Sequence, residues 1–285
     1  MSEPLDIVYR AIDEQNADKP AATRRQLVAG AGALLGGMGL LGLPGVASGF
    51  HKGQFNNGRN GLDTVPKQDL QTILNVATTA EVLATIVNTV GSVGSTAEGG
   101  VKVGPVALPR DGNQKLSASA TQELGHYEVL RALGGKPLTK RIWVPDAVFS
   151  SSDAFLSTVE VGDQVFINAY LIATTAFAKA GLGDVARAAA EFMGVEAVHR
   201  AFARDLRGVP GNDRMFMKFD QPEEAPGAPN RGRAGFQRIE GAVAQLEAAG
   251  IGFGKAGAGP GKFYEFDTVK AQTPNPDFVN TREPE

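Results

Sequence analysis

Two short segments of this 285-residue chain each place a glutamate three residues before a histidine, and this repeated pair constrains the fold most strongly. The segment 188–207, AAAEFMGVEAVHRAFARDLR, carries Glu196 and His199 in the pattern of a helix of about five turns. At 3.6 residues per turn, the spacing puts the carboxylate and the imidazole side by side on one face. Phe192 and Ala203 share that face. The pair therefore points into an apolar interior, where ionisable groups are costly unless something pairs or ligates them.

A second copy of the pair lies upstream, in SASATQELGHYEVLRALGG, where Glu123 and His126 share a face with Leu116 and Leu130. The chain has only three histidines, and two of them belong to such pairs. The third, His51, lies in a segment rich in Gly and Asn that reads as a loop. The sequence thus predicts two helices that turn the same pair of groups inward.

Two further helices complete the expected architecture. Glu81 is the only acidic residue between Leu70 and Thr89, and it falls in an apolar stripe that includes Leu74 and Ala84. A cluster of Ser and Asp at 150–153 is typical of a helix N-terminus. With Gly and Pro at the breaks, the sequence predicts four helices, at about 66–90, 117–133, 153–180 and 184–207, the third with a break at Gly162.

These segments resemble the helices of exported bacterial ferritin-like proteins, which are similar to the plant desiccation-related proteins. QELGHYEVLRALGG and AAAEFMGVEAVHRAFAR are similar to the second and fourth helices, LQTILNVATTAEVLATIVNT to the first and DQVFINAYLIATTAFAKAG to the third. The resemblance covers about residues 70–207. It implies an all-α fold, a ferritin-like four-helix bundle with an irregular N-terminal leader and a Gly/Pro-rich C-terminal extension.

The resemblance also implies a metal site, because two Glu-x-x-His helices and two helices with one carboxylate each are the ligand set of two-metal bundles. The ligands it implies are Glu81, Glu123, His126, Asp163, Glu196 and His199. The third helix departs from the family, which has a Glu seven residues before the residue equivalent to Tyr170; here that residue is Asp163. Asp is one methylene shorter, so either Asp163 ligates from a closer helix, Glu160 replaces it, or Asp163 only caps the helix after Gly162.

Composition limits the chemistry. The chain has no Cys, so a metal must be held by carboxylate and imidazole, a set that suits Fe, Mn or Zn. The net charge of −3 gives no basic footprint for a nucleic-acid partner. We therefore expect the protein to bind metal ions, preferably a pair of iron ions, with Mn or Zn as alternatives. The sequence leaves open whether the protein forms a homo-oligomer.

The N-terminal region indicates export. Arg24 and Arg25 precede a Gly-rich apolar stretch without charges, which resembles a twin-arginine leader, with cleavage near Ala47 or Ser48. An uncleaved leader would instead be a membrane anchor. The expected organisation is a leader at 1–49, a linker at 50–65, the bundle at 66–207 and an extension at 208–285 with one short helix, at about 234–249. Residues 136–149, with Ile142, Trp143 and Val144, read as a loop capping the bundle.

Two functions remain open from the sequence. The first is an exported ferritin-like protein that binds one or two metal ions, with oxidase or stress-protective activity outside the cytoplasm. The second is a metal-free ferritin-like scaffold that acts in binding or envelope stress protection, with the Glu and His residues as a buried hydrogen-bonded network. A fold resemblance does not supply the substrate.

Overall fold

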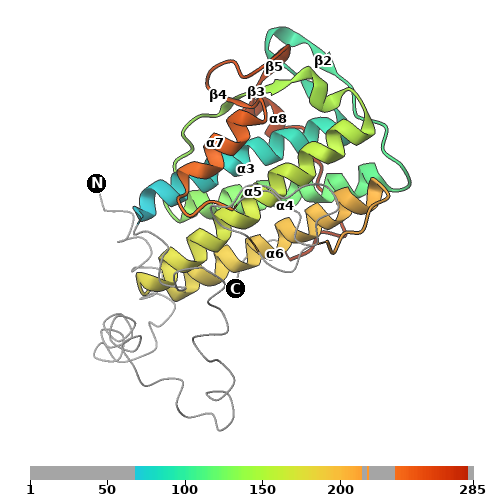
Figure 1. Cartoon of the computed structure of the whole chain (residues 1–285). Helices are drawn as coiled ribbons and strands as arrows, with labels where there is room; N and C mark the ends of the chain where they lie inside the picture. Colours follow the sequence, from blue (N-terminus) through green and yellow to red (C-terminus); the bar gives the residue numbers. More distant parts are fainter. Residues whose placement is uncertain (1–67, 214–216, 218–234, 282–285) are drawn as a thin grey trace.

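Four long helices form the body of the protein, whose computed structural model describes residues 68–213, 217 and 235–281 (Figure 1). They are α3 (Leu70–Val93), α4 (Gly112–Ala132), α5 (Ser152–Lys179) and α6 (Gly183–Leu206). No strand interrupts any of the four predicted spans over the described residues. The predicted all-α bundle is confirmed, whereas the predicted leader and linker lie outside the described residues.

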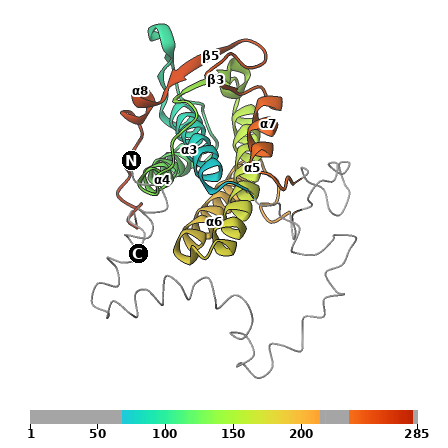
Figure 2. The same cartoon turned by 90° about the vertical axis from the view of Figure 1, so that its left-hand side faces the viewer.

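The four helices form two hairpins joined by a long crossover. α3 packs along α4, and α5 packs along α6, as Figures 1 and 2 show. Gly135, just after α4, lies against Thr78 near the start of α3, whereas Phe155, near the start of α5, lies against Gly91 near the end of α3. The connecting segment 133–151 therefore crosses the length of the bundle, so α4 and α5 run in the same direction and each hairpin is antiparallel. This arrangement turns the middle of all four helices toward one interior.

The helix α3 begins later and ends later than the sequence predicts. It begins at Leu70 because the Asp69 side chain accepts a hydrogen bond of 2.7 Å from the backbone N–H of Thr72, and Pro66 does not open it. It continues through Gly91, where the sequence predicted its end, to Val93. Gly91 has no Cβ, and the Phe155 ring occupies the space that a Cβ would take. The glycine therefore serves close packing between α3 and α5 and does not end the helix.

Replacing Gly91 by Ala should lower the free energy of unfolding by about 1–3 kcal/mol, because the new Cβ would overlap the buried Phe155 ring. The loss should exceed the gain of about 1 kcal/mol from the better helix propensity of Ala. Gly125→Ala in α4 is the matched control, since a Cβ there meets no atom within 4 Å. Urea denaturation of both variants measures the difference. A destabilisation that persists unchanged in a Phe155→Leu background would contradict this explanation.

Two other helix predictions need correction. α4 begins at Gly112, five residues before the predicted Ser117, so part of the expected loop is helical. α5 passes through Gly162 without a break, because the flanking turns are held by buried residues, among them Val159 and Phe166. The unbroken helix carries Asp163 into the interior.

The crossover between α4 and α5 contains a strand where the sequence predicted a loop. β3 (Arg141–Pro145) is the central strand of an antiparallel sheet, flanked by β4 (Gly252–Phe253) and β5 (Gly261–Glu265) from the C-terminal extension. Ile142 and Val144 are buried under this sheet, so they do cover the bundle as expected. The sheet lies on the opposite side of the molecule from α6 in Figures 1 and 2. A two-stranded ribbon, β1 (Ser95–Thr96) with β2 (Lys102–Val103), and two single turns, η2 (Glu98–Gly100) and η3 (Asp146–Phe149), complete the connections.

The C-terminal extension packs on the bundle and contains more structure than one short helix. α7 (Glu240–Ala248) lies beside α5, and α8 (Phe266–Lys270) packs on α3. The predicted helix at 234–249 begins late because the Asn168 side chain of α5 pairs with both backbone groups of Phe236, at 2.7 and 2.9 Å, and holds that residue outside the helix. The extension is therefore fastened to α5 by a buried polar contact.

Within the described residues, α3 is also the one helix long and apolar enough to cross a membrane by length and composition. Its most apolar window is 94% buried inside the protein, as expected for the central helix of a bundle. The predicted alternative of a membrane anchor concerns the leader, which lies outside the described residues.

Candidate metal centre

All six predicted metal-site residues converge on the middle of the bundle. Every side chain is buried, the most exposed being that of His126. Their donor atoms form two groups of four, and within each group all atoms lie within 4.8 Å of one another. The residues come from all four helices: Glu81 from α3, Glu123 and His126 from α4, Asp163 from α5, and Glu196 and His199 from α6. The two histidines thus face a common volume.

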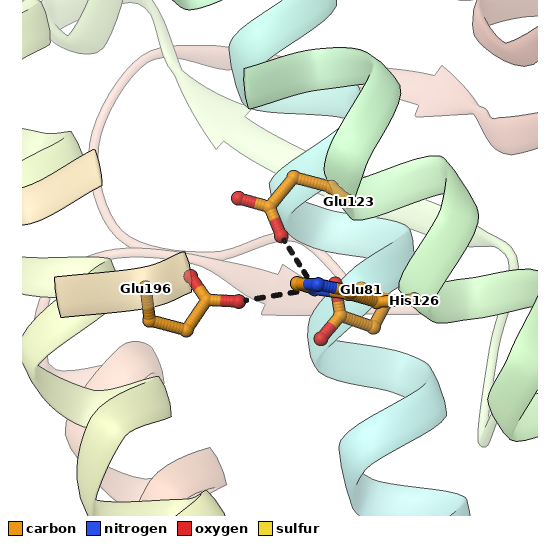
Figure 3. A group of neighbouring side chains, drawn as sticks. All are labelled: Glu81, Glu123, His126 and Glu196. Atoms are coloured by element: carbon orange, nitrogen blue, oxygen red, sulfur yellow. Dashed lines mark ion pairs between the residues drawn. The ribbon is translucent and has the colours of Figure 1, made fainter. Parts of the chain in front are cut away.

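The first group, called here position 1, surrounds the imidazole of His126. Its Nδ1 lies 3.3 Å from Glu196 Oε1, 3.6 Å from Glu123 Oε2 and 3.7 Å from Glu81 Oε2 (Figure 3). Neighbouring ligands on an ion with bonds of about 2.1 Å are about 3.0–3.4 Å apart for octahedral or tetrahedral angles. The spacing around His126 therefore fits a cation between these four side chains after small adjustments.

The second group, position 2, surrounds His199 and shares two residues with the first. His199 Nδ1 lies 3.0 Å from Glu123 Oε1 and 3.7 Å from Glu196 Oε2, and Asp163 provides the fourth donor. Glu123 turns one oxygen toward each histidine, and so does Glu196. Both glutamates are thereby arranged to bridge the two positions, with Glu81 and Asp163 at the outer ends.

Asp163 lies at position 2, and Glu160 does not. One turn earlier on α5, Glu160 pairs with Arg204 of α6 and with Arg207, the residue that follows α6. Its charge is thus used in an ion-pair network outside the two groups. Of the sequence alternatives, Asp163 is therefore the α5 carboxylate that lies beside the other predicted ligands, because the helix approaches closely enough for the shorter side chain.

Several buried donor atoms of these groups have no hydrogen-bond partner, although unpartnered buried polar atoms cost about 1–3 kcal/mol each. These atoms are Glu81 Oε2, Glu123 Oε2, His126 Nδ1, Asp163 Oδ2 and both carboxylate oxygens of Glu196. The three glutamates lie within ion-pair distance of a histidine Nδ1, but without hydrogen-bond geometry at these atoms. A purely hydrogen-bonded network would leave few such atoms. Their number, and their direction toward two common points, fit cations as the missing partners.

The pKa values show how strongly the centre requires positive charge. Burial, reinforced by the charge of Glu123, raises the pKa of Glu81 well above its ordinary value. Burial and then the charge of Glu196 raise the pKa of Asp163 in the same way. Both shifts have the same physical cause: without cations, four neighbouring buried carboxylates are costly to ionise together.

The histidines compensate the remaining charge. Burial acts to lower the pKa of His199, but the charge of Glu123 outweighs it and raises the value to about 10. The pKa of His126 is also well above its usual range, since contacts with three carboxylates outweigh burial. Burial acts to raise the pKa of Glu123, but the charge of His199 and contacts with both histidines leave it below its ordinary value. Protons thus occupy, in the metal-free protein, the role that cations would take.

Three polar residues that sequence reasoning missed orient the donors. The Tyr170 hydroxyl donates to Glu81 Oε1, which directs the other oxygen toward position 1. Gln122 Oε1 lies 2.7 Å from His199 Nε2, so the ring can donate there, with Nδ1 directed into position 2 at 3.0 Å from Glu123 Oε1. Asn88 Nδ2 donates to Glu123 Oε1 at 3.2 Å. Asn88 follows Glu81 by two helical turns, so the two residues share a face of α3. That spacing is the sequence signal that could have placed Asn88 beside the metal centre.

Residues 69–209 match a family model described as a ferritin-like domain. This part of the chain is a ferritin-like domain. It contains the four long helices and all six residues of the two groups. Searches among curated proteins and among solved structures found no match to the chain. The extension that follows the ferritin-like domain, with α7, α8 and two strands of the sheet, lies outside the matched residues.

Proposed function

We propose that the ferritin-like domain holds two metal ions, preferably iron, one at position 1 and one at position 2. The observation that carries this proposal is that Glu123 and Glu196 belong to both groups, each with one oxygen toward each histidine. The donor set of carboxylates and imidazoles suits Fe, Mn and Zn. Two ferrous ions would supply one electron each, two in all, to dioxygen or peroxide.

The surrounding residues prepare the centre for such ions. Glu81 and Asp163 would bind one ion each, and Glu123 and Glu196 would bridge the pair. Phe192 stacks on the His126 ring with 4.1 Å between the ring centres, which fixes the imidazole and excludes water from that side. Tyr170, Gln122 and Asn88 hold individual oxygen and nitrogen atoms in place through hydrogen bonds. Little rearrangement is then needed when the ions enter.

The function that fits this centre is an oxidase-type or stress-protective activity that consumes ferrous ions with dioxygen or peroxide. The metal-free scaffold is the competing function, and the unpartnered donor atoms argue against it. Anaerobic dialysis of the metal-free protein against ferrous ion should give two ions per chain, and admission of air should then consume dioxygen. No bound iron, manganese or zinc would leave the scaffold function standing. Bound metal without dioxygen consumption would restrict the proposal to metal binding.

A prediction for the centre concerns Gln122, which orients His199. Replacing Gln122 by Leu should weaken metal binding at position 2 by about 10- to 100-fold, because the imidazole loses its outer hydrogen bond. Position 1 should be nearly unaffected. Gln114→Leu, on an exposed face of the same helix, is the control. Competition titrations with a chelator measure both affinities; equal weakening of both ions, or of neither, would refute the assigned role of Gln122.

We also propose that the protein is exported by the twin-arginine route, since Arg24 and Arg25 precede a Gly-rich apolar stretch. Replacing both arginines by Lys should trap the protein in the cytoplasm. Fractionation of cells that express the two forms measures the distribution. Replacing Lys19 by Arg, which keeps the charge outside the motif, is the control. Unchanged secretion of the double variant would show that the leader has another function.

A further inference from the structure

A pocket of about 280 Å³ opens beside position 2, between α3, α5 and the region of α7. Its walls are mainly apolar, and both the ferritin-like domain and the extension contribute to them. The apolar lining includes Leu83, Val87, Val159, Phe166, Leu246 and Ile251. Because Leu246 and Ile251 lie outside residues 69–209, the extension closes the pocket. The pocket therefore belongs to this chain as a whole and not to the bundle alone.

The pocket also has polar lining residues, Asn88, Ser157, Thr158 and Asp163, and two of them connect it to the metal centre. Asp163 lines the pocket and is also a member of position 2. Asn88 lines it too and donates to the bridging Glu123. Both residues are almost fully buried, at 3% and 2% exposure. Asp163 Oδ2 belongs to position 2, whereas Asn88 Oδ1 has no hydrogen-bond partner and is not a member of either metal position. A hydroxyl group of a bound molecule would satisfy the amide oxygen of Asn88.

The surroundings of Gly162 indicate that the pocket has room for a ligand. It lines the pocket one residue before Asp163, and a Cβ at this position would meet no atom within 4 Å. A volume of 280 Å³ is about nine times the roughly 30 Å³ that one water molecule occupies in the liquid. This is the size of a short aliphatic molecule and matches the lower end of typical ligand pockets, about 300 Å³.

We propose that this pocket binds a neutral aliphatic molecule with one terminal hydroxyl, its chain along the apolar walls and its hydroxyl at Asn88 and Asp163. In the metal-free protein, an anionic head group would meet the carboxyl group of Asp163, which lies beside those of Glu123 and Glu196, and an apolar end would leave the Asn88 oxygen unpaired. The inference deepens the proposed function, on which it rests, because the hydroxyl then lies beside position 2. It names the substrate class that the centre would receive.

The test uses 1-octanol, which has nine non-hydrogen atoms, and the full-length metal-free protein. Calorimetry should detect binding of 1-octanol and at least tenfold weaker binding of octanoate. Gly162→Leu should fill the pocket and weaken 1-octanol binding at least tenfold. Gly125→Leu is the matched control, since Gly125 is also half-buried in a helix, precedes a predicted ligand and has no atom near its Cβ position. If Gly162→Leu lost helicity, Ala249→Trp at the opposite wall would replace it.

A second measurement gives the orientation. In protein loaded with Mn²⁺, relaxation of the 1-octanol protons should be fastest at the carbon that bears the hydroxyl and slowest at the methyl end. Equal binding to both glycine variants, no binding at all, or the reverse relaxation gradient would overturn the proposal. If Mn²⁺ did not bind, the proposed function would fail, while calorimetry on the metal-free protein would still decide whether the pocket binds the alcohol.

Discussion

Replacing Glu196 by Ala should remove both metal ions from the protein, because this residue gives one oxygen to each position. Glu123→Ala should have the same effect for the same reason. The loss should be nearly complete, since each ion would lose one of four protein ligands and the remaining charges would no longer balance. Elemental analysis of the purified variants, metal by metal, measures the content.

The controls for this prediction are glutamates on the same two helices that point to solvent. Glu128→Ala on α4 and Glu191→Ala on α6 should retain two ions per chain, since both side chains are more than half exposed. Circular dichroism should show intact helices in all four variants. Metal content that survives in Glu123→Ala and Glu196→Ala, with helicity and stability unchanged, would support the metal-free scaffold.

The stabilisation that metal ions provide should increase steeply with pH. In the metal-free protein, the raised pKa of His199, about 10, contributes stability that is present below about pH 6.5 and is lost as the pH rises toward 10. The raised pKa values of Glu81 and Asp163 act in the same direction. These carboxyl groups favour the protonated folded state, so their effect becomes destabilising once the pH exceeds the unfolded value near 4.

Metal ions replace these protons when they bind. The affinity for metal therefore rises with pH, whereas the stability of the metal-free protein falls. Each proton displaced should make the affinity rise about tenfold per pH unit. At a free metal concentration 100 times Kd, the gain in stability is about 2.7 kcal/mol, or roughly 5–10 °C in Tm for a domain of this size. Thermal melts at pH 5 to 9 with and without Mn²⁺ measure the difference, and Glu123→Ala is the control. A metal-induced shift that is independent of pH, or that falls as the pH rises, would contradict the proposed ligands.

Local patterns and the family resemblance were sufficient to predict the bundle and five of the six converging residues, namely Glu81, Glu123, His126, Glu196 and His199. Each Glu-x-x-His pair fixes a helix and its inward face, and Glu81 stands out as one acid in an apolar stripe. Asp163 could not be decided from the sequence, because its reach depends on how closely α5 approaches the other helices. The structure places it at position 2 and pairs Glu160 with arginines instead.

Long-range pairing explains what the sequence did not reveal. Residues 141–145 were predicted as loop because their strand partners lie more than a hundred residues later, in Gly-rich segments without alternating polarity. Gly91 and Gly162 read as helix breakers, but one allows close packing of Phe155 and the other lines a pocket. Gln122 and Tyr170 become recognisable as orienting residues only when α4 and α5 are placed against α6 and α3.

Anomalous X-ray diffraction from crystals of the manganese- or iron-loaded protein tests the two-metal centre most directly. The proposed centre predicts two peaks about 3.5–4 Å apart, one about 2.0–2.2 Å from His126 Nδ1 and the other at the same distance from His199 Nδ1. Glu123 and Glu196 should each contact both peaks. A single peak, a pair of peaks elsewhere in the bundle, or no peak in protein shown to be loaded would contradict it.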